Sequence, residues 1–266
     1  MLILASDTSG PSVSVALWQD GRLLGEMMQN IGLTHSVTYL PLVENMLRQC
    51  KKDIAEVDLF AVTVGPGSFT GIRIGISAVK AMAYAAQKPA VGVSTLEAMA
   101  WPYRCCPDLL VCPMLDARNG RVYACAWQNG NLILPEANQV LTDFIEQVSL
   151  YRDRSDSARQ PQSDYASQTG SQIMTLGCAL PQAILTPDHA GRPIIQTAPA
   201  MAWLPRAAAV AEIAAQVVED GFEQLDAPIR RIAAPDTPVP FSPVLEKAFI
   251  PQVEDVAGAL RELAGY

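Results

Sequence analysis

The opening of the chain contains three short stretches whose side chains suit β-strands. Leu2–Ala5 is a short apolar run, Ser12–Leu17 alternates small polar with apolar side chains, and Arg22–Met28 is a third stretch of the same kind. Asp20-Gly21 is a typical tight-turn dipeptide between the last two stretches. The pattern therefore predicts that the chain opens with three strands.

The spacing then becomes helical. Apolar residues three or four positions apart predict a helix over Thr34–Cys50, with Pro41 near its start: Val37, Leu40, Val43 and Leu47. Further elements are predicted in this order: a strand Val57–Val64, a helix Ser68–Gln87, a strand Ala90–Val93 and a helix Leu96–Ala100. This order predicts an α/β fold, a mixed sheet covered by helices, with a crevice at its strand ends.

The second of these helices is rich in glycine. Gly65-Pro66-Gly67 ends the preceding strand, and Ser68 is the expected N-cap. The helix has an apolar face and a face of small residues: Ile72, Ile76 and Val79, against Gly71, Gly75 and Ala78. A glycine inside a helix costs roughly 1 kcal/mol, so something must offset it. Either another helix backbone approaches closely, or free N–H groups at the start of the helix hold an anion. The glycine spacing matches neither the Walker phosphate loop nor the dinucleotide-binding fingerprint, so it does not decide between them.

A second β-rich unit follows Pro102–Pro107, where a domain boundary is predicted. Its predicted strands are Leu109–Asp116, Arg121–Trp127, Met174–Cys178 and Ile194–Thr197. A short helix is expected over Thr142–Leu150, a polar surface insertion over Tyr151–Gln172, and an alanine-rich helix over Ala200–Glu219. The predicted domains are 1–103, then 104–233, whose helix 200–219 packs back on the first domain, and a proline-rich acidic tail 234–266 that ends in an amphipathic segment, Val253–Leu263.

Composition narrows the function classes. The 266 residues carry a formal charge of −8, which disfavours independent binding of nucleic acid, since that needs a basic face. No apolar run approaches the ~18 residues of a membrane span, so a cytoplasmic protein is expected. Six cysteines without a C-x-x-C pair and two histidines, His35 and His189, offer little material for a metal site.

Several of these segments together resemble the TsaB (YeaZ) family: Asp7-Thr8-Ser9, His35-Ser36 with Leu40-Pro41, Gly65–Gly75, and Asp116-Ala117-Arg118 with Gly120–Tyr123. The resemblance runs from residue 1 to about 148 and resumes at about 175–221. It implies the actin/sugar-kinase/Hsp70-like (ASKHA) fold, with two domains of β-β-β-α-β-α type. It also implies a role in forming N6-threonylcarbamoyladenosine at position 37 of tRNAs that read codons starting with A.

The resemblance implies that this chain is a non-catalytic partner of TsaD. It would be an inactive paralogue of that transferase, and the complex would still need it for activity. TsaD-type chains carry a metal-binding His-x-x-x-His where this chain has Thr95 and Met99. The turn Asp7-Thr8-Ser9 lacks the glycine of the Asp-x-Gly-Thr found in nucleotide binders of this fold. The resemblance thus implies no catalytic residue, metal or cofactor in this chain, and places ATP or ADP and a metal ion in partner subunits.

The implied partners are a TsaD-like transferase, as a heterodimer, and a TsaE-like ATPase, with tRNA bound only through the complex and no membrane contact. A homodimer through the same helices is the alternative for the lone chain. The expected interface residues are His35, Ser36, Leu40, Pro41, Val43, Leu47, Ser68, Phe69, Thr70, Gly71, Ile74, Gly75 and Ala78. Candidate nucleotide or cleft contacts are Asp7, Thr8, Ser9, Asp116 and Arg118, the last two of which also suit a turn-stabilising pair.

Three single residues have open roles. His35 could lie at a helix start in the interface or take part in proton transfer. The Arg73 side chain could extend into solvent or contact a carboxylate of a partner. Arg121 stands where the family usually has an acidic residue, and 228–231 only echoes the family's closing Pro-x-Tyr-Leu-Arg segment.

Two other function classes compete with the scaffold. An ATP-dependent phospho- or carbamoyltransferase acting alone would place Asp7 near the phosphates, but the altered turn and the missing histidine pair oppose it. A metalloprotease fails on ligands, because no His-Glu-x-x-His occurs.

Overall fold

The computed structural model describes residues 1–32, 34–106, 109–158, 172–177 and 195–222. By their contacts, residues Met1–Ala215 form one compact unit that contains two five-stranded sheets, and Gln216–Tyr266 form a second unit. The first unit holds the elements that carry the candidate site.

The first sheet confirms the predicted run of three opening strands. Its strands lie in the order β3-β2-β1-β4-β5, and they are β1 (Leu2–Asp7), β2 (Val13–Gln19), β3 (Arg22–Gln29), β4 (Leu59–Gly65) and β5 (Ala90–Ser94). β1, β2 and β3 pair antiparallel, whereas β1, β4 and β5 pair parallel. The mixed sheet predicted from the order of hairpins and helices is therefore present.

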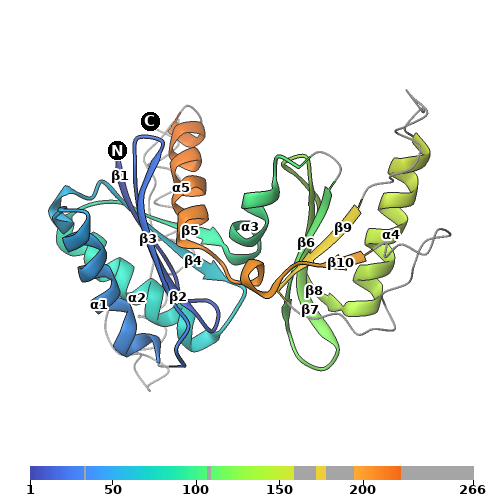
Figure 1. Cartoon of the computed structure of the whole chain (residues 1–266), viewed down its shortest axis with the longest axis horizontal. Coiled ribbons are helices and arrows are strands. Elements are labelled where there is room, and N and C mark those ends of the chain that lie inside the picture. The colour runs from blue at the N-terminus through green and yellow to red at the C-terminus, as the bar shows by residue number, and fades with distance from the viewer. Residues whose placement is uncertain (33, 107–108, 159–171, 178–194, 223–266) are drawn as a thin grey trace, which may run out of the picture. The chain divides into compact units, whose positions relative to one another are not determined.

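Both faces of this sheet are covered, and the alternation of side chains along β1 explains how. Leu2 and Leu4 point to a core shared with α1 (His35–Gln49) and α2 (Phe69–Ala86). Ile3 and Ala5 point to the opposite core, which the alanine-rich part of α5 (Ala207–Phe222) fills with residues 209–215. Figure 1 shows α1 and α2 on one side of the strands and α5 on the other.

The second sheet repeats this plan. Its order is β10-β9-β6-β7-β8, and its strands are β6 (Leu109–Asp116), β7 (Arg121–Gln128), β8 (Asn131–Val140), β9 (Gln172–Leu176) and β10 (Ile195–Thr197). An antiparallel β6-β7-β8 meander is again extended by two parallel strands, with α4 (Leu141–Ala158) on one face and α3 (Thr95–Ala100) on the other. Two related mixed sheets with helices on both faces confirm the actin/sugar-kinase/Hsp70-like class.

Short 3₁₀ turns complete the described elements: Ile54–Glu56, Trp101–Tyr103 and Ala200–Trp203. The last of these turns stands where the predicted helix 200–219 was expected to begin. Pro205 separates it from α5, because proline breaks the helical hydrogen bonds. α3 lies before the predicted boundary at residue 103 yet packs in the core of the second sheet. The predicted domain limits themselves remain a prediction.

The polar insertion predicted over Tyr151–Gln172 is wrong in its first part, because α4 continues to Ala158. Tyr151 explains the extension: its ring packs against the core that contains Phe144 and Val148, and its hydroxyl donates to Gln128 Oε1 at 3.2 Å. These three residues follow helical spacing, so the apolar face of α4 continues into the stretch of polar composition. The strand β8 (Asn131–Val140) was not predicted. The expected amphipathic segment 253–263 and residues 228–231, which resemble the family's closing segment, lie outside the described residues.

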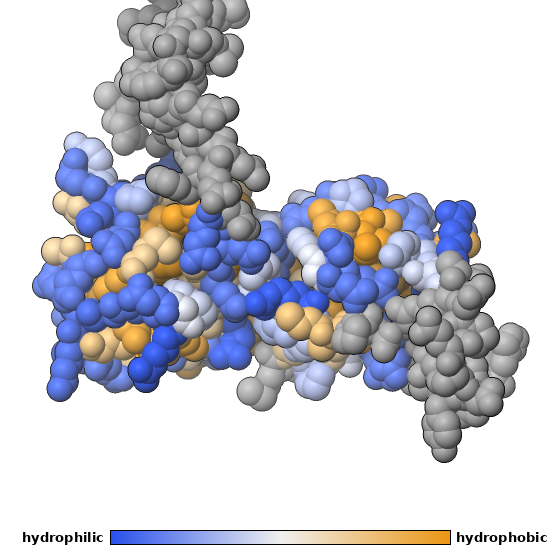
Figure 2. Space-filling view, turned by 90° about the horizontal axis from the view of Figure 1, so that it is seen from above, coloured by the Kyte–Doolittle hydropathy of each residue, from blue (hydrophilic) through white to orange (hydrophobic). Residues whose placement is uncertain are grey.

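In the part of the chain that the structure describes, no helix is both long and apolar enough to span a bilayer. On the face drawn in Figure 2, apolar areas are broken up by hydrophilic side chains.

The beginning of α5 is fastened to the first sheet by side chains of β2 and β3. The Ala207 N–H donates to Ser14 Oγ at 3.1 Å, and the Ala208 N–H donates to Glu26 Oε1 at 3.0 Å. Glu26 also accepts from the Arg206 guanidinium, at 3.0 Å from its Nε. These bonds satisfy N–H groups that the first turn of a helix leaves without a partner.

We expect Ser14→Ala to lower the free energy of unfolding by about 1–3 kcal/mol, because it leaves the buried Ala207 N–H without an acceptor. Ser12→Ala is the matched control, since Ser12 is equally buried but its hydroxyl has no partner among the described residues. Urea unfolding at neutral pH measures both. Equal losses in the two variants would contradict the assigned anchoring of α5.

Candidate functional site

The site begins at the turn that follows β1, where Asp7 ends the strand inside the protein. Its Oδ1 accepts hydrogen bonds from Thr63 Oγ1 at 2.7 Å, from Ser9 Oγ at 2.6 Å and from the Ser9 N–H at 3.3 Å. Its Oδ2 is buried without a partner among the described residues. Burial raises the pKa of this carboxyl above its usual value, against the opposing effect of the bonds from Ser9 and Thr63 and of the nearby His35. The fold therefore favours the protonated form of Asp7.

The glycine-rich loop closes directly over this turn. The Ser68 N–H donates to the Ser9 carbonyl at 2.7 Å, and Thr8 Oγ1 donates to the Gly71 carbonyl at 2.8 Å. A Cβ on Gly67 would overlap the Ser9 carbonyl oxygen, and one on Gly71 would overlap that of Thr8. The glycines thus permit a close approach of backbone to backbone, and the Ser68 and Gly71 N–H groups already have partners within the chain. Ser68 caps α2 as predicted, through its Oγ at 3.2 Å from the Gly71 nitrogen.

The predicted glycine surface for a partner helix is wrong. Gly71 and Gly75 are buried, and a Cβ on Gly75 would overlap Thr8 Oγ1 and crowd Val62. They share the core-facing stripe of α2 with Val79, and Ala78 is half-buried against the same core. The sequence indicated that a close approach was needed, but the approaching backbone belongs to the chain's own β1 turn.

Two residues of α1 were also assigned to the interface in error. Val43 and Leu47 are buried in the core between α1 and the first sheet. The predicted apolar stripe is in fact divided, because Val37 and Leu40 from the same spacing are 63% and 53% exposed. Pro41, at the outward side of the same helix, is exposed as well.

The outward faces of α1 and α2 carry exposed apolar side chains, and we call them the α1–α2 surface. Its large members are Val37 and Leu40 on α1 and Phe69 and Tyr84 on α2, the last two 73% and 81% exposed. The other predicted interface residues that are exposed here are Ser36, Pro41, Ser68 and Thr70, while Ile74 is half-buried. The guanidinium of Arg73 lies 5.2 Å from the centre of the Phe69 ring, so Arg73 is directed along this surface. Tyr84 was missed, although it lies one helical turn after Lys80, which was a usable signal for an outward face.

His35 joins this surface to the turn. Its Nε2 lies 2.9 Å from the Gly10 carbonyl, and a Cβ on Gly71 would crowd its ring. Nδ1 is buried without a partner in the described part of the chain. This geometry favours the role at the helix start: the ring fixes the beginning of α1 to the β1–β2 loop and to α2.

Asp116 and Arg118 form a turn. The Arg118 N–H donates to Asp116 Oδ1 at 2.7 Å, and Arg118 has a φ of 65°. Both are exposed, and among the described residues no hydrogen bond links them to the Asp7 turn. Arg121 is engaged nearby with Asn138, at 2.7 Å from Nε to Oδ1. Of the two interpretations, the geometry supports the turn-stabilising one.

A cleft of about 280 Å³ lies beside the turn, as expected for the strand ends of such a sheet. Ser9, Gly10 and Pro11 form one wall, and Trp203, Leu204 and Pro205 another. The lining is largely apolar and offers little to a phosphate.

The two positions that correspond to metal-binding histidines do not fit a metal. Thr95 and Met99 are both buried, and Met99 packs in the core of the second sheet. Within the described residues, no group of three or more histidine, cysteine, aspartate or glutamate side chains is arranged to hold a metal ion. The expected absence of a metal in this chain stays a prediction.

Comparison with known proteins gives one dominant likeness. The family model described as "TsaD: tRNA N6-adenosine threonylcarbamoyltransferase" matches residues 30–237. The chain is 38% identical over 154 residues to the tRNA threonylcarbamoyladenosine biosynthesis protein TsaB of Bacillus subtilis, over 56% of this chain and 66% of that protein. It spans 52–66% of the length of the first four curated TsaB relatives. The solved structure of YeaZ from Pseudomonas aeruginosa is similar with a TM-score of 0.60 and 28% identity, over 83% of this chain and 93% of that one.

A second likeness is short. Over 61 residues, or 23% of this chain, it is 51% identical to the β subunit of an acetoin oxidoreductase of Bacillus subtilis, of which only 18% is covered. So small a part of that subunit supports no transfer of its activity.

We expect Gly71→Ala to destabilise the fold by about 1–3 kcal/mol, because the added methyl overlaps the Thr8 carbonyl and outweighs the gain of ~1 kcal/mol in helix propensity. Gly10→Ala is the control, since a Cβ there meets only an ordinary contact with Pro205. Urea unfolding compares the two variants. Unchanged stability of Gly71→Ala would show that α2 does not rest on the turn.

The raised pKa of Asp7 predicts a pH dependence. A carboxyl whose pKa is higher in the folded than in the unfolded state destabilises the fold progressively as the pH rises above its unfolded value. Asp7→Asn should therefore gain stability relative to the unsubstituted chain as the pH rises from about 4 to neutral, while Asn still accepts from Thr63. Urea unfolding at several pH values measures this difference, and a difference that is constant or of opposite slope would contradict it.

Proposed function

The chain belongs to the family that the threonylcarbamoyltransferase model describes and, within it, to the TsaB (YeaZ) group; on this premise we propose that it is the non-catalytic partner of a TsaD-like transferase. The complex of the two would form N6-threonylcarbamoyladenosine in tRNA. A TsaE-like ATPase is the further proposed partner. The observation that carries the partner role is the exposed α1–α2 surface.

This surface has the character of a helix-packing interface. Val37, Leu40, Phe69 and Tyr84 present large apolar side chains to solvent from two neighbouring helices. Burial of one such side chain contributes about 1.5–3 kcal/mol, so four together can outweigh much of the cost of association. Two helices of a partner would bury them in a four-helix contact. The rigid anchoring of α1 through His35 means that little order has to be gained on binding.

The β1 turn supports a role without catalysis. In a phosphate-binding turn the backbone N–H groups must be free for the ligand, whereas here the Ser9 N–H donates to Asp7 Oδ1 and the Ser68 N–H donates to the Ser9 carbonyl. Asp7 is fully buried and its Oδ1 already accepts bonds from Thr63 and Ser9, which leaves little access for a cation. We therefore propose no nucleotide and no metal for this chain, and assign both to its partners.

The charge of the chain supports contact with tRNA through other subunits. A formal charge of −8 opposes binding to phosphates, because such binding uses basic residues to displace counterions. In the proposed complex this chain organises the transferase, and the partner contacts the nucleic acid.

We expect Leu40→Asp and Phe69→Asp each to weaken binding to the TsaD-like transferase of the same organism by at least about a hundredfold, since a charge then has to be desolvated at the centre of the interface. Both side chains are mostly exposed in the lone chain, so its melting temperature should change little. Isothermal titration calorimetry measures the affinity.

Leu132→Asp is the matched control, because Leu132 is an exposed apolar residue on β8 of the other sheet. It should bind as the unsubstituted chain does. Loss of binding in all three variants, or in none, would remove the α1–α2 surface from the proposal. Single-turnover transfer to tRNA by the isolated chain would overturn the non-catalytic role itself.

A further inference from the structure

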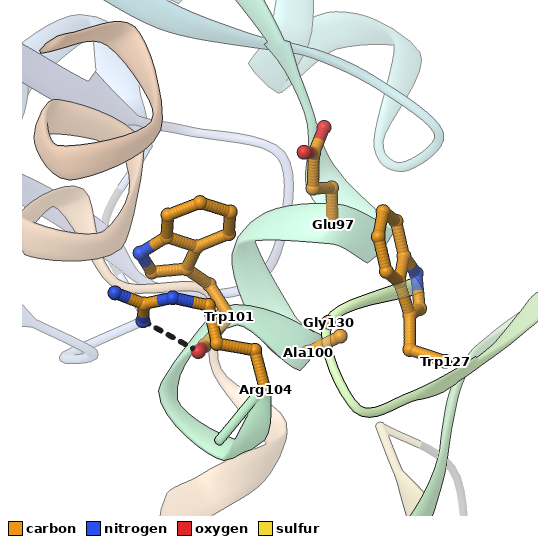
Figure 3. A pocket seen from close by; sticks show the side chains of 6 residues that line it. All are labelled: Glu97, Ala100, Trp101, Arg104, Trp127 and Gly130. Atoms are coloured by element: carbon orange, nitrogen blue, oxygen red, sulfur yellow. Dashed lines mark hydrogen bonds between the residues drawn. The ribbon is translucent and has the colours of Figure 1, made fainter. Parts of the chain in front are cut away.

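A small cavity lies between α3 and the β7–β8 turn, away from the α1–α2 surface. Its lining is formed by Glu97, Ala100, Trp101, Arg104, Trp127 and Gly130. Its volume is about 10 Å³, which is room for one group of the size of a water molecule. Figure 3 shows the side chain of Glu97 between the indoles of Trp101 and Trp127, which form the flanks of the cavity.

The lining contains one carboxylate, that of Glu97, and among the described residues it has no ion pair. Burial raises the pKa of Glu97, and the carboxylate of Glu136 adds to this effect. Glu136 is held by a hydrogen bond from Ser94 Oγ at the end of β5. Among the described residues, neither glutamate has an ion pair with a basic side chain.

Arg104 is the basic residue of the lining, but its guanidinium is engaged elsewhere. Its NH2 group pairs with Glu212 at 2.6 Å, and its NH1 group donates to the Trp101 carbonyl at 3.0 Å (Figure 3). The guanidinium lies 4.0 Å from the centre of the Trp101 ring. The Trp101 ring therefore already makes a cation–π contact with the Arg104 guanidinium, whereas Glu97 has no ion pair with a cation among the described residues.

We propose that this cavity binds the terminal ammonium group of a lysine-like alkyl cation. The ammonium is compact enough for the space, and its N–H groups donate to the Glu97 carboxylate. Indole is the ring that attracts cations most strongly, so Trp101 and Trp127 favour the same occupant, and their apolar surface suits the methylene stem. A guanidinium is too broad for the cavity, and a divalent metal would find too few oxygen ligands. Glu97 is only half-buried, so the cation can enter from solvent.

The test uses the full chain labelled with ¹⁵N and follows the four indole N–H signals of Trp18, Trp101, Trp127 and Trp203. The probe is Nα-acetyl-lysine methylamide, and its Nε-acetylated form is the uncharged control. The charged probe should shift the Trp101 and Trp127 signals saturably, in the millimolar range, and leave those of Trp18 and Trp203 in place. Glu97→Gln should weaken this binding at least about fivefold, because it removes the charge at nearly unchanged volume.

Glu146→Gln serves as the matched variant, since Glu146 is an exposed carboxylate on α4. It should bind the probe as the unsubstituted chain does, and the amide spectra of both variants report whether they fold. Absence of a saturable shift, equal binding by Glu97→Gln, or equal binding of the uncharged probe would each overturn the proposal. Spermidine separates the two sources of such a cation: affinity at least about tenfold above that of the lysine probe indicates a free polyamine, and similar affinity indicates a lysine of a protein.

Discussion

The approach of the glycine-rich loop to the β1 turn is the constraint on which the rest of the first sheet's site depends. The bond from Thr8 to the Gly71 carbonyl and the bond from Ser68 to the Ser9 carbonyl bring α2 against the backbone of the turn. His35 then rests on both, so the start of α1 is fixed by the same contact. The contact closes the turn to phosphate and orients the outward faces of the two helices. The proposed binding surface and the proposed lack of a nucleotide site therefore rest on the same contact.

Much of the fold follows from short-range patterns. The short apolar run Leu2–Ala5 predicted a strand, and the dipeptide at Asp20-Gly21 predicted the turn to β3. The glycines of α2 gave close packing as one of two alternatives, but Gly71 and Gly75 have no feature that identifies which backbone approaches. Likewise the spacing of Val37, Leu40, Val43 and Leu47 could not say which half of the stripe faces inward, because that depends on how α1 lies against β2 and β3.

Other features were missed because the local composition conceals them or because they arise from contacts between distant segments. The polar composition after residue 150 concealed the end of α4, where one tyrosine packing against β7 outweighs its hydrophilic neighbours. β8 alternates weakly, and its place beside β7 comes from the turn at Asn129-Gly130. The carboxylate and indoles of the small cavity come from α3, the turn that follows it and β7, so no motif contains them together.

The position of α5 has a consequence for synthesis of the chain on the ribosome. Residues 209–215 fill the core on the second face of the first sheet, beside Ile3 and Ala5 from the other end of the unit. A sheet whose five strands are complete by residue 94 must then keep an apolar face uncovered while more than a hundred further residues are translated. At about 5–20 residues per second this interval lasts roughly 6–23 s, during which the exposed apolar face can be bound by chaperones. The first sheet can therefore reach its native packing only after the second sheet and α5 have been synthesised.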